Sequence, residues 1–225
     1  SRHSMSDGFS VIPSRPINRR TQNEVMFLPR LVLASSSESR ARMLASAGLS
    51  FDREPVRIDE AAIRASLEAD GASPRDIADA LAEFKARKGH DRHPDAVVLG
   101  SDQVLALKGR ILGKAADREA AAHQLAELQG QTHMLLSSAV IYNDGAPVWR
   151  GIGQARMTMH ALTLAQIDAY LDIAWPEVSS SVGVYHAEAY GARLFSRIDG
   201  DWFTVLGLPL LDVLSFLRLR GWLTP

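Results

Sequence analysis

A serine-rich segment near the start of the regular pattern offers hydroxyl and guanidinium groups to an anion. Leu31-Val32-Leu33-Ala34 is a short apolar run typical of a buried strand, and Ser35-Ser36-Ser37-Glu38 follows it directly. The spacing of Ser35 and Glu38 is that of a capping box, which predicts that a helix begins here. Such a helix start exposes free N–H groups and a partial positive charge, and Arg40 adds a forked guanidinium. The segment has the composition of a phosphate site, or of an ordinary capped helix with a solvated arginine.

Acidic residues stand at two further points where a divalent cation could bind. Ala96–Gly100 has the pattern of an apolar strand. Asp102, two residues later, is expected near its carboxyl end, where α/β sheets open their ligand crevice. Asp59-Glu60 is expected in an acidic turn. Because oxygen donors of this kind suit Mg²⁺, Glu60 and Asp102 are candidate metal ligands. The alternatives are a turn aspartate and two solvated surface acids.

Two lysines complete the set of residues with phosphate chemistry. Lys85 is expected on a helix that begins at Ser73-Pro74, and Lys114 follows Gly113 in an expected turn. A lysine ammonium acts as a point charge on a phosphate, although a single lysine is more commonly a surface charge. The formal net charge of −1 gives no global attraction to nucleic acid or to an anionic membrane. Any phosphate binding must therefore come from a local site.

The elements that must hold these residues alternate between helix and strand. Strands are expected at residues 31–34, near Phe51, and at residues 96–100, 132–142 and 148–159. Helices are expected from Ser35 to Gly48, from Ser73 with the buried stripe Ile77, Leu81 and Phe84, after Asp117, after Thr163, and over residues 211–219. Asn143-Asp144-Gly145, between the last two strands, is a strong hairpin signal. Together these patterns predict an α/β fold with a mixed sheet.

The composition excludes several classes of protein. A hydrophobic fraction of 46% with 23% charged residues is ordinary for a globular chain. The absence of cysteine excludes disulfides, thiolate zinc sites and cysteine nucleophiles, and it fits a reducing compartment. No apolar run approaches the roughly 20 residues of a transmembrane helix. Residues 1–29 are polar and irregular and are expected to form a disordered extension, whereas residues 30–225 are expected to form one domain.

Taken in order, these segments resemble the Maf family. The resemblance rests on Leu33–Arg40, Asp59-Glu60, Lys85, Gly100–Asp102, Gly113-Lys114 and Gly207-Leu208-Pro209-Leu210, and it covers about residues 31–220. The family usually has Ser-Pro-Arg-Arg where this chain has Ser37-Glu38-Ser39-Arg40, so only the second arginine is kept. The likeness implies a two-lobed α/β fold, similar to that of inosine-triphosphate pyrophosphatases, with a mixed twisted sheet and a central cleft.

The resemblance also implies an activity, the hydrolysis of a nucleoside triphosphate to a monophosphate and pyrophosphate with Mg²⁺ or Mn²⁺. It implies that Glu60 and Asp102 bind the metal and act in catalysis. It further implies that the triphosphate is held by Ser35, Ser37, Arg40, Lys85 and Lys114. Gln103 and Glu188 resemble the branch described as acting on 7-methyl-GTP rather than on dTTP and UTP, and together with Ser39 they are expected to select the base. A cytoplasmic homodimer is expected, with a nucleoside triphosphate as its substrate and without a nucleic-acid or membrane partner.

Two other functions stay open at this point. An inosine-triphosphate-type pyrophosphatase shares the reaction and a similar architecture, although its opening signature is absent from this chain. A nucleotide-binding regulator of cell division without turnover would use the same binding residues. Magnesium-dependent release of pyrophosphate separates the enzymes from the regulator.

Overall fold

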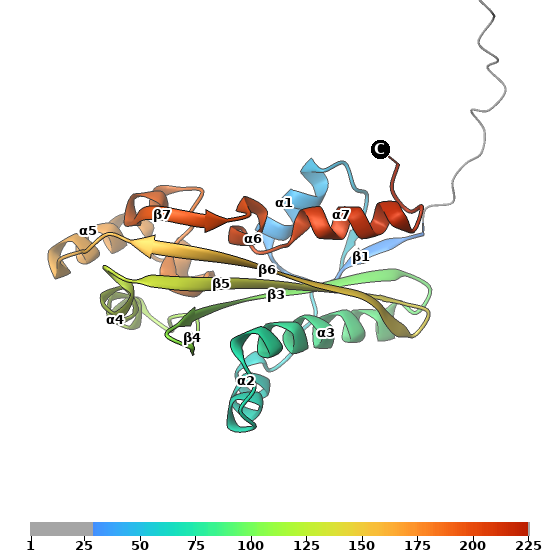
Figure 1. Ribbon diagram of the computed structural model, residues 1–225, viewed down its shortest axis with the longest axis horizontal. Helices are drawn as coiled ribbons and strands as arrows, with labels where there is room; N and C mark the ends of the chain where they lie inside the picture. The colour runs from blue at the N-terminus through green and yellow to red at the C-terminus, as the bar shows by residue number, and fades with distance from the viewer. Residues whose placement is uncertain (1–28, 225) are drawn as a thin grey trace, which may run out of the picture.

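The structure, a computed structural model, describes residues 29–224 of the 225-residue chain. Its centre is a seven-stranded mixed sheet with the order β2-β1-β3-β5-β6-β7, and β4 pairs with β3 (Figure 1). The strands are β1 (Leu31–Leu33), β2 (Asp52–Arg53), β3 (Val97–Leu107), β4 (Arg110–Leu112), β5 (Thr132–Asn143), β6 (Ala146–Met159) and β7 (Phe195–Gly200). The helices are α1 (Glu38–Ser46), α2 (Glu60–Ala69), α3 (Pro74–Arg92), α4 (Arg118–Leu128), α5 (Leu164–Ala174), α6 (Trp202–Val205) and α7 (Leu210–Leu219). Three short 3₁₀ turns lie between α5 and β7.

The sheet combines parallel and antiparallel pairing, as the sequence predicted. β1 is parallel to both β2 and β3, whereas β3, β5, β6 and β7 pair antiparallel in succession. Asp144 and Gly145, both with positive φ, form the tight turn between β5 and β6. The predicted hairpin is therefore confirmed, and its long strands give the molecule its length.

Two lobes share the long strands β3, β5 and β6. In one lobe, α1 and α7 cover one face of the sheet around Leu44 and Val213, and α3 covers the other through Ala82 and Ala86. In the second lobe, α4, α5 and the segment before β7 bury a separate core that includes Leu125. Figure 1 shows α3 and α7 on opposite sides of the sheet, with α4 and α5 at its far end. The expected two-lobed fold is confirmed.

Asp102 lies in the middle of β3, so its predicted place at a strand end is wrong. β3 continues to Leu107 because it pairs with β5 from Val98 to Ala106 and its last three residues pair with β4. On the edge opposite β5, β1 pairs with β3 only as far as Leu99, and β4 pairs only from Leu105 onward. Residues 100–104 have no strand partner on that edge within the described chain. This gap between two short strands is what opens the sheet beside Asp102.

Gly100 sets how closely α3 approaches the sheet. An added Cβ at Gly100 would lie 2.4 Å from both the Ala82 carbonyl oxygen and the Ala86 amide nitrogen. A helix can lie this near a strand only where the strand residue lacks a side chain. Phe84 is 44% exposed, so its predicted place in the buried stripe is wrong. Ile77 and Leu81 are buried as predicted, and the part of α3 that lies against Gly100 is formed by Ala82 and Ala86.

Several local predictions at helix starts hold, and two need correction. The capped starts at Ser73, Asp117 and Thr163 are confirmed, the last with a complete capping box. The first helix is capped by Ser37 rather than Ser35, because the Ser37 hydroxyl accepts the Arg40 amide. Asp59 and Glu60 do not form a separate turn, since Asp59 caps α2 and Glu60 is the first residue of that helix.

The N-terminal extension expected over residues 1–29 lies outside the described residues, apart from Pro29. Across residues 29–224, no helix has both the length and the apolar character required to cross a membrane.

Candidate active site

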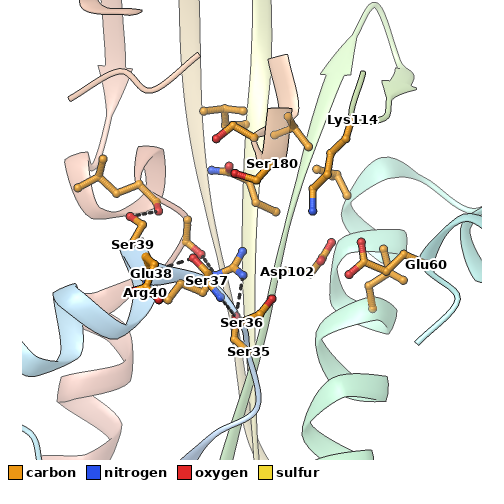
Figure 2. A pocket seen from close by; sticks show the side chains of 18 of the residues that line it. Ser35, Ser36, Ser37, Glu38, Ser39, Arg40, Glu60, Asp102, Lys114 and Ser180 are labelled. Carbon is orange, nitrogen blue, oxygen red and sulfur yellow. Dashed lines mark hydrogen bonds between the residues drawn. The ribbon is translucent and has the colours of Figure 1, made fainter. Parts of the chain in front are cut away.

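A cleft of about 950 Å³ opens beside the unpaired stretch of β3. One wall is the start of α1 with residues 205–207, and the other is formed by α2, α3 and the end of β4. Residues 180–182 and 185–189 of the second lobe complete the lining. Figure 2 shows Ser35, Ser37 and Arg40 on one side of this cleft, and Glu60 and Lys114 on the other. The predicted central cleft is confirmed.

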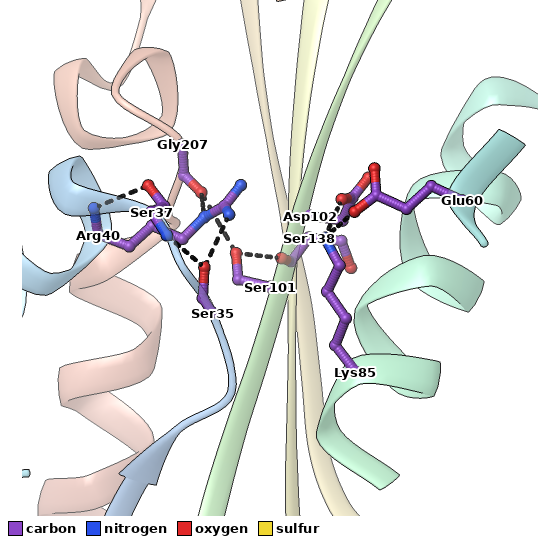
Figure 3. Close-up of polar contacts among 9 residues, drawn as sticks. All are labelled: Ser35, Ser37, Arg40, Glu60, Lys85, Ser101, Asp102, Ser138 and Gly207. Carbon is purple, nitrogen blue, oxygen red and sulfur yellow. Dashed lines mark hydrogen bonds and ion pairs between the residues drawn. The ribbon is translucent and has the colours of Figure 1, made fainter. Parts of the chain in front are cut away.

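Arg40 is held rigidly on the first wall. Its Nε donates to the carbonyl of Gly207 at 2.7 Å, and its Nη1 donates to the Ser35 hydroxyl at 3.3 Å. The same Ser35 oxygen accepts the Ser37 amide at 3.1 Å. Ser101 also donates to the Gly207 carbonyl, at 3.2 Å. A carbonyl 167 positions away in the sequence thus supports the Arg40 guanidinium, and this contact places the late Gly-Leu-Pro-Leu segment in the site (Figure 3).

The buried guanidinium remains a cation in this setting. Burial lowers the pKa of Arg40 below its usual range, and the charges of Asp102 and Glu60 oppose that change. Its fixed direction and the free amide groups at the start of α1 suit an oxyanion.

The second wall carries an ion triad of Lys85, Glu60 and Asp102. The Lys85 ammonium lies 2.7 Å from Asp102 Oδ1 and 2.7 Å from Glu60 Oε1 (Figure 3). Three elements build it, since Glu60 begins α2, Lys85 lies on α3 and Asp102 lies on β3. Lys85 reaches the strand because α3 sits close against Gly100.

The two carboxylates of the triad differ in their proton affinity. Burial raises the pKa of Asp102, and the nearby charges of Lys85 and Arg40 only partly offset that rise. At Glu60, partial burial also raises the pKa, but attraction to Lys85, together with weaker attraction to Lys114 and Arg40, outweighs it and leaves a net decrease. Asp102 is therefore the better proton acceptor of the two, and Glu60 holds its negative charge more firmly.

The remaining predicted residues all line the same cleft. Lys114 follows β4 and points its ammonium toward Glu60 and Asp102 (Figure 2). Ser39 donates its hydroxyl to the Leu206 carbonyl at 2.9 Å, so it joins α1 to the opposite end of the chain. Glu188 is exposed on the stretch contributed by the second lobe. The fold thus brings every predicted site residue into one cavity.

Hydrogen bonds donated by its amide nitrogen fix the orientation of the Gln103 side chain. Its Nε2 donates to Ser137 Oγ and to the carbonyls of Thr204 and Val205, each at 3.1 Å. These contacts hold the amide nitrogen against the protein interior. No hydrogen bond within residues 29–224 uses the Oε1 atom, which leaves a hydrogen-bond acceptor in the cleft lining.

The model of the Maf-like protein family matches residues 30–220. The chain belongs to the Maf family. Among its relatives, nucleoside triphosphate pyrophosphatase 1 of Jannaschia sp. (strain CCS1) is 63% identical over 198 residues, which cover 88% of this chain and 100% of that protein. Nucleoside triphosphate pyrophosphatase of Ruegeria pomeroyi is 52% identical over 191 residues, covering 85% and 96%. The 7-methyl-GTP pyrophosphatase of Mesorhizobium japonicum is 44% identical over 192 residues, covering 85% and 96%. The predicted family is confirmed.

The Maf site has donors suited to a hard divalent cation. Glu60 and Asp102 provide carboxylate oxygens, which Mg²⁺ and Mn²⁺ prefer. Within the described residues no group of three or more His, Cys, Asp or Glu side chains converges as a metal cage. Two carboxylates fit a cation that completes its shell with phosphate oxygens and water. The Lys85 ammonium now lies between these carboxylates, so a cation binding there would compete with it.

Sequence reasoning missed three residues of the Maf cleft. Arg64 lines it from α2, Tyr185 lines it from the second lobe, and Ser101 supports Gly207 beneath it. Arg64 carried a usable signal, because a residue four positions after Glu60 shares its helix face. Tyr185 carried none, since its place depends on a segment that only the tertiary fold positions.

Proposed function

We propose that this Maf protein hydrolyses a nucleoside triphosphate to a monophosphate and pyrophosphate. The proposal rests on one observation, which is that two walls with different chemistry face each other across one cleft. A fixed guanidinium and a helix start face the Glu60–Lys85–Asp102 triad. The two relatives named nucleoside triphosphate pyrophosphatase support it over most of their length.

The chain's own residues would bind and orient the phosphates. The amide groups at the start of α1, the hydroxyls of Ser35 and Ser37, and Arg40 offer donors to phosphate oxygens. Lys114 adds a point charge from the other side. Holding the substrate in this way supplies much of the rate gain in phosphoryl transfer. Lys85, expected on the phosphates, contacts both acids instead, and its predicted contact with substrate stays a prediction.

We assign Asp102 the role of proton acceptor for the attacking water. Water oxygen bonds to the α-phosphorus, the bond from that phosphorus to the α,β-bridging oxygen breaks, and the water proton passes to an Asp102 carboxylate oxygen. Burial raises the pKa of Asp102, which strengthens it as a base. Glu60 and Asp102 would hold Mg²⁺ or Mn²⁺, which when bound neutralises phosphate charge and acidifies water.

A guanine-type base fits the acceptors on the base side of the proposed site. Gln103 presents Oε1 and Glu188 presents a carboxylate, and both would accept hydrogen bonds from N–H groups of a purine edge. The relative named 7-methyl-GTP pyrophosphatase supports a modified guanine nucleotide as substrate. Ser39, whose hydroxyl is engaged by Leu206, would contribute through its small size.

The decisive experiment measures pyrophosphate released from canonical and modified nucleoside triphosphates by the full chain, with Mg²⁺, with Mn²⁺ and with chelator. We expect metal-dependent release, with guanine nucleotides ahead of pyrimidine ones. Asp102→Asn should lower kcat by about 10²- to 10⁴-fold while circular dichroism shows a folded chain. Wild-type turnover in this variant would remove Asp102 from the chemistry. Tight nucleotide binding without any pyrophosphate release would favour a regulator over an enzyme.

The assembly and location are also proposals. The family resemblance supports a homodimer in the cytoplasm, and the net charge of −1 supports a chain without a nucleic-acid or membrane partner. Sedimentation of the purified chain and localisation of a tagged copy in cells test these two points.

A further inference from the structure

We propose that Arg64 binds substrate, holding with Lys114 the phosphates that leave as pyrophosphate. This inference rests on the proposed function, because it assigns an additional cation to the same cleft. The inference comes from where α2 places Arg64.

Arg64 lies one helical turn beyond Glu60 on α2. Residues four apart on a helix share a face, and the two are separated by about 6 Å along the axis. Both side chains line the cleft. Because the reacting phosphorus must lie beside Asp102, a cation one turn beyond Glu60 is placed for the outer phosphates.

The guanidinium of Arg64 lies against the backbone at Gly113, next to Lys114. An added Cβ at Gly113 would lie 2.9 Å from Arg64 Nη1 and 3.2 Å from Nη2. The absence of a side chain at Gly113 therefore leaves the space that the guanidinium fills. Two cations from different elements, α2 and the segment after β4, therefore line the same cleft.

The donors of Arg64 are largely unengaged. Its one ion pair in the described part of the chain joins Nε to Glu68 Oε1 at 3.8 Å, close to the limit for such a contact. No hydrogen bond within residues 29–224 uses Nη1 or Nη2. The side chain is 31% exposed, so it is accessible from the cleft without being fully solvated. A guanidinium with both terminal nitrogens free can bind a phosphate through two parallel hydrogen bonds.

The charges of the cleft show why further cations are needed. Glu60 and Asp102 are offset by Lys85, which contacts both, and by Arg40, whose charge acts on both. Before a divalent cation binds, that balance of side-chain charges leaves little positive charge for a triphosphate. Lys114 and Arg64 supply it on the side of the cleft opposite the start of α1.

The test measures binding of inorganic pyrophosphate and of a nucleoside monophosphate by calorimetry with Mg²⁺ present. For Arg64→Ala we expect pyrophosphate affinity to fall about 10- to 100-fold, the usual effect of losing charged hydrogen bonds, and monophosphate affinity to stay within about twofold. Arg64→Lys should recover part of the loss. Arg75→Ala, which removes an exposed arginine from the start of α3 outside the cleft, is the matched control and should leave both affinities unchanged.

Gly113→Ala gives a second, independent test. The added methyl group would displace the Arg64 guanidinium, so it should weaken pyrophosphate binding in the wild-type background and have no further effect in Arg64→Ala. Four results would each overturn the inference. Folded Arg64→Ala could keep its pyrophosphate affinity, or it could lose affinity equally for pyrophosphate and for the monophosphate. Gly113→Ala could have equal effects in both backgrounds, or the wild type could show no measurable pyrophosphate binding. Wild-type turnover is assayed separately. If the wild type turns over substrate and Arg64→Ala keeps the wild-type affinity for pyrophosphate, only this inference is refuted. If pyrophosphate binding depends on Arg64 but the wild type shows no turnover, only the proposed enzyme activity is refuted.

Discussion

His133 is a buried imidazole whose titration should make the stability of this protein depend on pH. It is fully buried on β5, its Nε2 lies 2.8 Å from the hydroxyl of Tyr185, and its Nδ1 has no hydrogen-bond partner. Burial lowers the pKa of His133 from 6.5 to about 4. Tyr185 lines the cleft, so this pair supports the wall contributed by the second lobe.

The direction of the effect follows from the two pKa values. Between about pH 6.5 and pH 4 the unfolded chain binds a proton at His133 that the folded chain does not bind. The free energy of unfolding therefore falls as pH decreases through this window, and the contribution is fully present above about pH 6.5. At about 1.4 kcal/mol per unit of pKa, the loss on reaching pH 4 amounts to about 3 kcal/mol.

The assay is urea unfolding of wild type and His133→Gln, followed by tryptophan fluorescence at half-unit steps from pH 7.5 to 4. Carboxylates titrate in both proteins, so the difference between the two curves isolates His133. We expect the stability of wild type relative to His133→Gln to fall by about 3 kcal/mol across this range. His123→Gln, at an exposed histidine of α4, should stay parallel to wild type. His133→Asn replaces the glutamine variant if that variant does not fold. Parallel curves for wild type and the folded position-133 variant would refute the reasoning.

Two further predictions concern the elements that build the ion triad. Gly100→Ala places a methyl group 2.4 Å from the backbone of Ala82 and Ala86, so α3 must move; we expect a loss of about 1 to 3 kcal/mol in urea unfolding, together with reduced turnover. Unchanged unfolding midpoints would mean that α3 does not lie against Gly100. Lys85→Ala leaves buried Asp102 without its closest cation; we expect a loss of about 3 to 5 kcal/mol at pH 7, which becomes smaller at low pH as Asp102 is protonated. A loss independent of pH would contradict the ion pair.

Local signals in the sequence predicted much of the secondary structure. Ser73-Pro74, Asp117 and the Thr163 capping box each mark the start of a helix, because a cap is satisfied by residues two or three positions away. Asn143-Asp144-Gly145 likewise marks its hairpin through local backbone geometry. At Ser35 the same reasoning was wrong, because that hydroxyl accepts from Ser37 and Arg40 and leaves the cap to Ser37.

The sequence by itself determined the family, the mixed α/β fold class and the identity of the polar residues that share the cleft. Those features depend on residue types and on their order along the chain, so the local chemistry of short segments is enough to predict them. Only the tertiary structure decided that Asp102 lies within a strand, that Lys85 joins it to Glu60, and that Gly207 fixes a guanidinium 167 residues away. Strand pairing and helix approach set these contacts between distant segments, and no local spacing records them.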